Sequence, residues 1–305
     1  MRGCGNGFEE EGEMMSFGEA IAYGAATIIN AIATGRGAAF GVDLWTRARV
    51  RKTNDVGKIE CKILSEPSEN TALIKEAVLK VYRHFSVQDK FGAYAETESN
   101  IPIAKGLKSS SVAANALVLA TTAALGKKLK DSDVLELSVN AAVSAKTTIT
   151  GAFDDTCASF FGNVVITDNL NRKILQNFDV EENLVVLFHI PPLKSYTYTS
   201  NVKRMKLIAS HVEVAFKEAL LGNYWTALTL NGVLYSAALG YDAGPAIDAL
   251  EAGALASGLS GKGPATVAVA HGDIANEILD AWRTYGGDVI RAKVNKEKSR
   301  VTRQS

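Results

Sequence analysis

The chain has few cysteines, and their number and spacing do not suggest a set of disulfides. Only three occur in 305 residues, Cys4, Cys61 and Cys157, and they are far apart and odd in number. A disulfide framework or a cysteine-based metal site needs paired or closely spaced cysteines. The pattern argues against both kinds of site and predicts a protein of a reducing compartment, the cytoplasm.

Excess charge of either sign is also missing. The sequence has 33 basic and 33 acidic residues and a pI near 6.9. A surface for nucleic acid or for an anionic membrane needs clustered positive charge. We therefore expect neither as the main partner, and a small-molecule ligand fits better.

Two further absences narrow the class of protein. No apolar run reaches the ~18 residues of a membrane span, so we expect a soluble protein without membrane contact. The four histidines do not show the spacing of a metal site.

Residues 1–14 are rich in glycine and glutamate and have neither the basic start nor the apolar centre of a signal peptide, so we predict a disordered extension there.

The remaining residues predict a mixed fold. Helices are expected over 27–33, 68–85, 109–125, 132–145, 202–221, 224–239, 242–256 and 273–285. Strands are expected over 37–44, 47–51, 59–64, 91–99, 163–167 and 184–190, with 47–51 and 59–64 pairing antiparallel. Residues 147–162 are expected to form a loop, and residues 258–270 a glycine loop that leads into a buried strand. The order lacks the regular alternation of a doubly wound parallel sheet, which favours the α+β class. Residues 293–305 are polar and basic, and we expect them to fray.

The segment from Pro102 to Val112 has the composition of an anion-binding loop. Gly106 is followed by Ser109, Ser110 and Ser111, and these serines open an alanine-rich helix that stops at Gly126. Serine is favoured at the start of a helix and glycine just after its end. The unpaired N–H groups and the dipole at such a start favour a phosphate. Lys105 and Lys108 add positive charge, although a purely structural cap remains an alternative.

This loop matches neither the P-loop nor the dinucleotide-binding spacing, but it resembles the phosphate-binding motif of the GHMP kinases, Pro-x-x-x-Gly-Leu-Gly-Ser-Ser-Ala-Ala. Lys108 stands where that motif has its second glycine, and Ser111 where it has alanine. The segment Ser260-Gly-Lys-Gly-Pro-Ala-Thr266 is similar to the third motif of the family, Ser-Gly-x-Gly-Pro-Thr. The resemblance covers 16–294. Within the family, residues 25–44 and 150–159 resemble the archaeal type of shikimate kinase.

The resemblance implies a two-domain GHMP kinase fold. It places an N-terminal α+β nucleotide-binding domain at 15–165 and a C-terminal ferredoxin-like α/β sandwich at 166–305. The implied reaction is transfer of the γ-phosphoryl group of ATP to the 3-hydroxyl of shikimate, with Mg²⁺. ATP would be held by residues of the first and third motifs, namely Pro102, Lys105, Gly106, Leu107, Lys108, Ser109, Ser110, Ser111, Gly261 and Gly263.

Phosphoryl transfer needs positioning and charge neutralisation more than covalent chemistry. A serine hydroxyl in the cradle can bind the metal, and we favour Ser110. A carboxylate near the acceptor hydroxyl can orient it or accept its proton. Asp154 and Asp155 are the candidates, with Asp155 preferred. The helix over 132–145 offers only Glu136 as a further carboxylate for the metal.

Shikimate carries a carboxylate and three hydroxyls, so its pocket should contain a cation and neutral hydrogen-bonding groups. Thr27, Asn30 and Asp43 are candidates for the hydroxyls. The carboxylate could pair with a cation from the set Arg49, Lys146, Lys194 and Lys203. Lys194 opens a polar loop that is either a lid or a surface connection.

Two other functions stay open. One is a different GHMP kinase, acting on homoserine, pantoate or mevalonate, and the other is a nucleotide-binding protein of the same fold without catalysis. The sequence leaves the oligomeric state open, with a homo-oligomer among the options.

Overall fold

The computed structural model describes residues 16–103, 105–149, 151–192 and 201–305. The extension predicted at 1–14 and the substrate candidate Lys194 lie outside these ranges. The described residues form two sheets with helices packed on them, so the predicted α+β class is confirmed.

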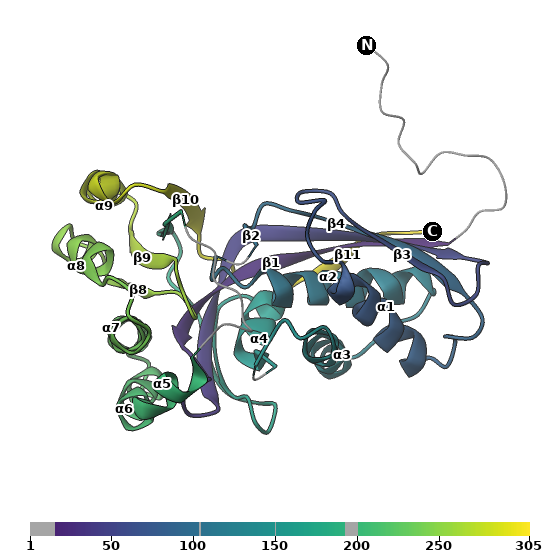
Figure 1. The fold of residues 1–305 in the computed structure, drawn as a ribbon, viewed down its shortest axis with the longest axis horizontal. Coiled ribbons are helices and arrows are strands. Elements are labelled where there is room, and N and C mark those ends of the chain that lie inside the picture. The colour runs from purple at the N-terminus through teal and green to yellow at the C-terminus, as the bar shows by residue number, and fades with distance from the viewer. Residues whose placement is uncertain (1–15, 104, 150, 193–200) are drawn as a thin grey trace, which may run out of the picture.

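The first sheet contains seven strands and is built around the long strand β2. Its order is β11, β1, β2, β4, β3, and β5 also pairs with β2 and carries β6 beside it. The strands are β1 (Phe17–Ile29), β2 (Arg36–Thr53), β3 (Ile59–Ile63), β4 (Gly92–Ser99), β5 (Val164–Asp168), β6 (Lys173–Phe178) and β11 (Arg300–Gln304). Four helices lie along one face of this sheet (Figure 1): α1 (Ala72–His84), α2 (Ser109–Ala124), α3 (Asp131–Ser144) and α4 (Phe153–Phe161).

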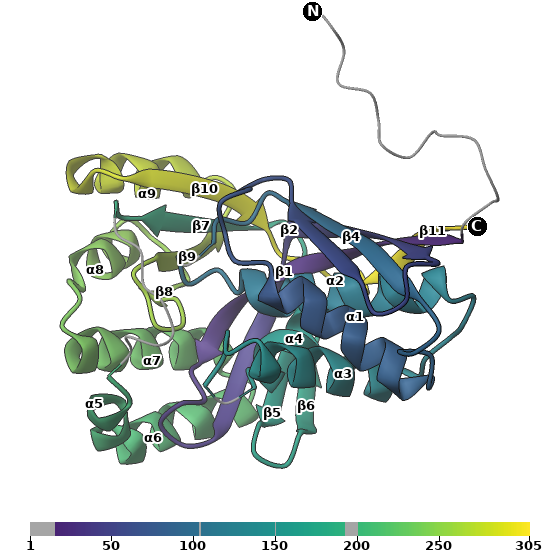
Figure 2. The same ribbon diagram turned by 45° about the vertical axis from the view of Figure 1, so that its right-hand side comes forward.

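The second sheet is antiparallel and has the order β10, β7, β9, β8. Its strands are β7 (Leu184–Ile190), β8 (Ala256–Leu259), β9 (Thr266–His271) and β10 (Asp288–Lys293). Its helices gather at the opposite end of the molecule from α1 (Figure 2): α5 (Val202–Leu207), α6 (Ala209–Leu220), α7 (Tyr224–Leu239), α8 (Gly244–Glu251) and α9 (Ala275–Trp282), followed by a 3₁₀ turn at Arg283–Tyr285. One buried apolar cluster extends through both sheets, so the two parts share a core.

Small residues in β1 let it lie directly against α2. A Cβ added at Gly18 would lie 2.2 Å from the carbonyl oxygen of Ala120, so only glycine fits.

The helix predicted over 27–33 is wrong, because residues 27–29 belong to β1. This run is apolar on both faces, and periodicity does not separate a fully buried strand from a short helix.

The chain end was also predicted wrongly. Residues 300–304 do not fray but form β11, which pairs antiparallel with β1. The segment 59–64 does form a strand, β3, but it runs parallel to β4 and is not paired with 47–51. Residues 47–51 lie within β2 and pair with β1 and β4.

Three local predictions are corrected in a similar way. The loop expected to carry Asp154 and Asp155 is the first turn of α4. The helix expected over 202–221 is divided at Ile208 into α5 and α6. β6 was not predicted, since its residues are half-buried or exposed and give little apolar signal.

The domain boundary at 165/166 stays a prediction, although β6 and β11 both lie beyond it and belong to the first sheet. Among the described residues, the structure contains no helix that combines the length and apolar character needed to cross a membrane.

Candidate active site

A cleft lies where the start of α2 faces the start of α4 and the loop between β8 and β9. This arrangement brings together motifs that are about 150 residues apart in the sequence. Ten of the predicted site residues line it: Asn30, Gly106, Leu107, Lys108, Ser109, Ser110, Ser111, Asp154, Asp155 and Gly263.

The start of α2 differs in detail from the prediction. The residue before the first turn is Lys108, with φ of 65°, and the three serines form the first turn itself. Among the described residues, no side chain caps this helix. The positive end of a 16-residue helix and three hydroxyls are therefore available at the cleft, which is what an anion requires.

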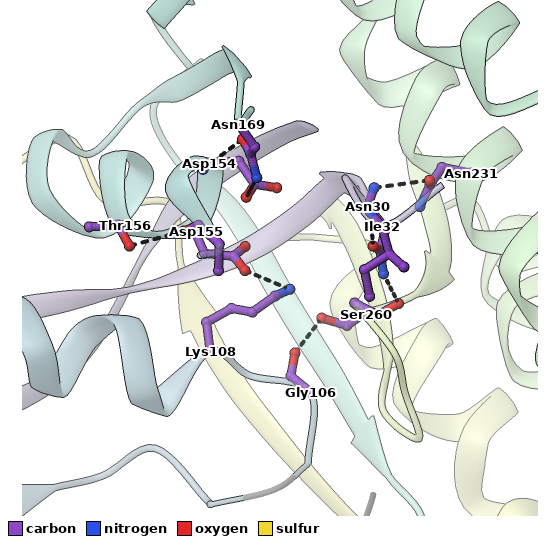
Figure 3. A network of polar contacts seen from close by, with 12 residues as sticks. Asn30, Ile32, Gly106, Lys108, Asp154, Asp155, Thr156, Asn169, Asn231 and Ser260 are labelled. Carbon is purple, nitrogen blue, oxygen red and sulfur yellow. Dashed lines mark hydrogen bonds and ion pairs between the residues drawn. The ribbon is translucent and has the colours of Figure 1, made fainter. Parts of the chain in front are cut away.

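The two aspartates occupy the first turn of α4 and are held differently (Figure 3). Asp154 accepts a 2.7 Å hydrogen bond at Oδ1 from Asn169 Nδ2. Asp155 Oδ2 lies 3.0 Å from Lys108 Nζ, and both side chains are largely shielded from solvent. Asp155 Oδ1 is buried and has no hydrogen-bond partner among the described residues. One oxygen of Asp155 is thus paired with Lys108, and the other is unpaired among the described residues.

Burial and the neighbouring charge of Asp155 raise the pKa of Asp154 to about 7, although Lys108 and Asn169 act in the opposite direction. A carboxyl group taken out of water next to a like charge favours its protonated form. Near pH 7, Asp154 and Asp155 together therefore carry less than two full negative charges.

The loop after β8 closes the cleft from the second sheet. Ser260 Oγ donates a 2.9 Å hydrogen bond to the carbonyl oxygen of Gly106, and Asn30 Nδ2 donates one of the same length to that of Gly261 (Figure 3). A Cβ on Gly106, whose φ is +86°, would lie 2.7 Å from the Ser260 carbonyl oxygen. The glycine of the first motif is thus required by contact with the third motif. The Gly263–Pro264 peptide bond in this loop is cis.

Lys262 also lines the cleft, although it is not among the predicted site residues. Burial, together with the nearby charge of Lys108, lowers its pKa to about 8. Its place within Ser-Gly-Lys-Gly-Pro was the signal that could have identified it. Thr147, Thr148 and Ile149 line the cleft as well, and they carry no comparable signal.

Several predicted residues lie elsewhere. Asp43 is exposed on β2 and accepts a 2.7 Å hydrogen bond from the Lys293 backbone, so the structure does not bring it to the cleft. Arg49 pairs with Glu19 and Glu96 within the first sheet. Glu136 is exposed and lines a separate groove on α3, so it does not supply the cleft with a carboxylate.

Of the other predicted ligands, Asn30 alone is part of the cleft lining among the described residues. Pro102 and Gly261 belong to the two loops but are not part of its lining, and Lys105 Nζ donates to the Pro191 carbonyl oxygen at 3.3 Å. Thr27 is buried, and its hydroxyl has no hydrogen-bond partner among the described residues. Asn30 lines the cleft, but its Oδ1 accepts from the Ile32 backbone and its Nδ2 is bound to Gly261. Its observed contacts therefore shape the loop.

Comparison with known proteins places the chain in a family. Residues 72–163 match the GHMP kinases N terminal domain and residues 212–288 match the GHMP kinases C terminal domain. The chain belongs to the GHMP kinase family. It is 45% identical over 283 residues to a shikimate kinase of Methanothermobacter thermautotrophicus, covering 91% of this chain and 96% of that protein. It is 43% identical over 274 residues to a shikimate kinase of Pyrococcus abyssi, covering 90% and 97% of the two chains.

Solved structures of GHMP kinases share the fold at much lower identity. A homoserine kinase from Cytophaga hutchinsonii superposes with a TM-score of 0.74 at 18% identity, covering 96% of this chain and 99% of that one. A mevalonate kinase from L. major gives 0.68 at 16%, covering 92% and 97%. As a member of this family the chain is a kinase, and membership implies ATP as the phosphoryl donor.

Proposed function

We propose that this GHMP kinase is a shikimate kinase, which transfers the γ-phosphoryl group of ATP to the 3-hydroxyl of shikimate. Its relatives named shikimate kinase are 41–45% identical and align with about nine tenths of the chain. These relatives support shikimate as the acceptor. The observation that supports phosphoryl transfer is the convergence of the serine turn, the aspartate pair and the third motif on one cleft.

The serine turn is proposed to hold the phosphates of ATP. Ser109, Ser110 and Ser111 line the cleft at the start of α2, where the first backbone N–H groups have no partner within the helix and the helix dipole adds a partial positive charge. Lys262 adds a cation from the opposite wall. These groups would stabilise the negative charge on the transferring group, which is the main task of a phosphotransferase.

Asp155 is the proposed partner of the acceptor hydroxyl. Its Oδ1 is buried and unpartnered, so a hydroxyl entering the cleft would supply the missing hydrogen bond. The acceptor oxygen forms the new bond to the γ-phosphorus as the bond to the bridging oxygen breaks, and ADP leaves. The hydroxyl proton passes to Asp155 Oδ1.

The donor set of the cleft fits Mg²⁺, which prefers oxygen ligands and binds through few protein groups together with substrate phosphates. Ser110 and Asp155 both line the cleft, and each carries oxygen atoms. Among the described residues there is no cluster of three or more acidic, histidine or cysteine side chains that could bind a metal alone. We propose that Ser110 holds the ion together with the phosphates of ATP, where it would neutralise charge.

The acceptor is tested with the purified full-length chain, ATP and Mg²⁺, offered shikimate, homoserine, pantoate or mevalonate in parallel. ADP release measures turnover, and NMR of the product identifies the phosphorylated hydroxyl. We expect turnover with shikimate and a phosphate on its 3-hydroxyl. Turnover of another alcohol without turnover of shikimate would reject the proposal in favour of a different GHMP kinase.

The same assay tests the role of Asp155. Asp155→Asn should lower kcat by about 10²–10⁴, the usual contribution of a general base. Asp55→Asn is the matched control, because Asp55 is exposed in the loop between β2 and β3 and should leave kcat unchanged. Nucleotide binding without turnover of any acceptor would indicate a non-catalytic protein of this fold.

A further inference from the structure

We infer that Lys108 is a positioning residue that holds Asp155 in its reactive orientation, and that residue 261 lacks a side chain so that the lysine ammonium can fit there. This inference rests on the proposed role of Asp155. Lys108 stands where the family motif has glycine, so the motif does not imply this role for the residue.

The backbone of Lys108 is held in a conformation that disfavours lysine. Its φ of 65° is in the left-handed region, where a residue with a Cβ is strained and glycine is not. The residue also stands immediately before the first turn of α2, and its side chain does not cap the helix. A strained residue persists where the surrounding structure holds it, and such residues concentrate at functional sites.

The side chain of Lys108 points across the cleft to Asp155. Its Nζ lies 3.0 Å from Asp155 Oδ2, and only 14% of the lysine side chain and 8% of the aspartate side chain are exposed. A charged hydrogen bond at this distance in a shielded place fixes the plane of the carboxylate. Because Lys108 pairs with Oδ2 alone, Oδ1 of Asp155 stays unpaired and can accept a hydrogen bond.

The ammonium also contacts the third motif. A Cβ built on Gly261 would lie 2.7 Å from Lys108 Nζ and 3.3 Å from its Cε. A side chain at position 261 would therefore displace the lysine from Asp155. Lys108 links the phosphate loop, the aspartate and the loop after β8, and Gly261 provides the space in which it does so.

Three substitutions separate this role from its alternatives. Lys108→Gly removes the side chain and relieves the backbone strain, Lys108→Met removes the charge but retains the strain, and Lys108→Arg keeps the charge. We expect kcat to fall at least about 30-fold in both the glycine and the methionine variants, with KM for ATP within about threefold of wild type. The arginine variant should recover part of the lost kcat.

Two patterns would overturn the inference. If the glycine variant is as active as wild type while the methionine variant is impaired, the backbone of the loop matters and the ammonium does not. If kcat is retained and KM for ATP rises in both, Lys108 binds phosphate. The variant-to-wild-type ratio is read on whichever acceptor the wild type phosphorylates, so failure of shikimate as acceptor is distinguished from failure of this inference.

Non-additivity gives the decisive check, because the double variant leaves neither charge of the Lys108–Asp155 pair without its partner. Lys108→Met combined with Asp155→Asn removes both charges, and its kcat should be within about threefold of that of Asp155→Asn alone. A product of the two separate losses would show that Lys108 acts independently of Asp155 and would reject the inference.

Gly261→Ala tests the space around the ammonium. We expect it to lower kcat about 10-fold or more in the wild type but little further in the Lys108→Gly background, where no ammonium is displaced. Gly126→Ala is the matched control for backbone strain, because Gly126 also has a left-handed φ, +65°, but no atom of the described residues lies within 4 Å of an added Cβ. An equal loss at position 261 in both backgrounds would contradict the proposed contact.

Discussion

Asn169 holds Asp154 at two points. Its Nδ2 donates a 2.7 Å hydrogen bond to Asp154 Oδ1, and its Oδ1 accepts one of 3.2 Å from the Asp154 backbone. Thr167 donates a 2.6 Å hydrogen bond to the same Oδ1 of Asn169, and a Cβ on Gly37 would lie 2.4 Å from Asp154 Oδ2. Asp154 is therefore fixed by the first sheet, whereas Asp155 is fixed by the phosphate loop.

The Asp154→Asn variant should be more stable than the wild type at alkaline pH. The folded-state pKa of Asp154, about 7, lies above its unfolded value near 3.8, so the stability present below pH 3.8 is lost as pH rises through 7. The neutral amide avoids this loss, and we expect the variant to exceed wild type in Tm by several degrees at pH 8. Thermal unfolding between pH 5 and 9 measures the difference.

Asp168→Asn is the control of opposite sign. Hydrogen bonds from the side chain and backbone of Asn171 lower the pKa of Asp168, so its contribution is present at neutral pH and is lost as pH falls through the folded pKa. This variant should be slightly less stable than wild type at pH 8. A Tm difference for Asp154→Asn that does not grow between pH 5 and 8 would contradict the raised pKa.

Ser260→Ala should weaken the contact between the two loops. It removes the hydrogen bond to the Gly106 carbonyl oxygen, with an expected loss of about 1 kcal/mol in stability and a rise of a fewfold in KM for ATP. Ser257→Ala is the matched control, because Ser257 is also fully buried and donates a 2.9 Å hydrogen bond, but to Val267. Equal effects of both variants on KM would show that the loop contact does not shape the ATP site.

We expect kcat to fall at alkaline pH because Lys262 loses its proton there. Its pKa of about 8 means that the ammonium loses its proton as pH rises through 8, and the cleft then loses a cation. We expect kcat to fall across this range in the wild type and the fall to move to higher pH in Lys262→Arg, because arginine stays charged. Unchanged pH–rate profiles from pH 7 to 10 would exclude Lys262 as the titrating group.

Removal of residues 300–305 should destabilise the first sheet. The truncation exposes the edge of β1 and removes the 3.0 Å hydrogen bond from Thr302 to Glu19. A drop of several degrees in Tm is expected, with kcat at low temperature little changed, since β11 does not line the cleft. Thr302→Val removes only the hydrogen bond and should have a smaller effect. A truncated chain with wild-type Tm would show that β11 adds no stability.

Much of the site was predictable because its chemistry lies in short segments. The serine turn, the aspartate pair and the glycines of the third motif each carry a local signal, and the fold places Gly106 beside Ser260 as their shared family motifs implied. The target of the Lys108 ammonium was not predictable, since it depends on α4 lying across the cleft.

The errors have two physical sources. Thr27 and its neighbours were assigned to a helix because an apolar run buried on both faces has no diagnostic period. The last strand was assigned to a frayed end because its side chains are exposed, and only its backbone pairing with β1 shows its role. Asp43 was chosen as a partner for the shikimate hydroxyls, but it lies where the register of β2 shifts and accepts a hydrogen bond from the Lys293 backbone. Long-range pairing decided all of these positions.

The pairing of β11 with β1 also constrains the order in which the chain can fold. The backbone of Phe17 is hydrogen-bonded to Ser305, 288 positions away, so strand β1 is covered by a segment that is far from it in the sequence. Contacts between such distant residues form late and slow folding. During synthesis, the edge of β1 therefore stays unpaired until residues 300–305 have been made.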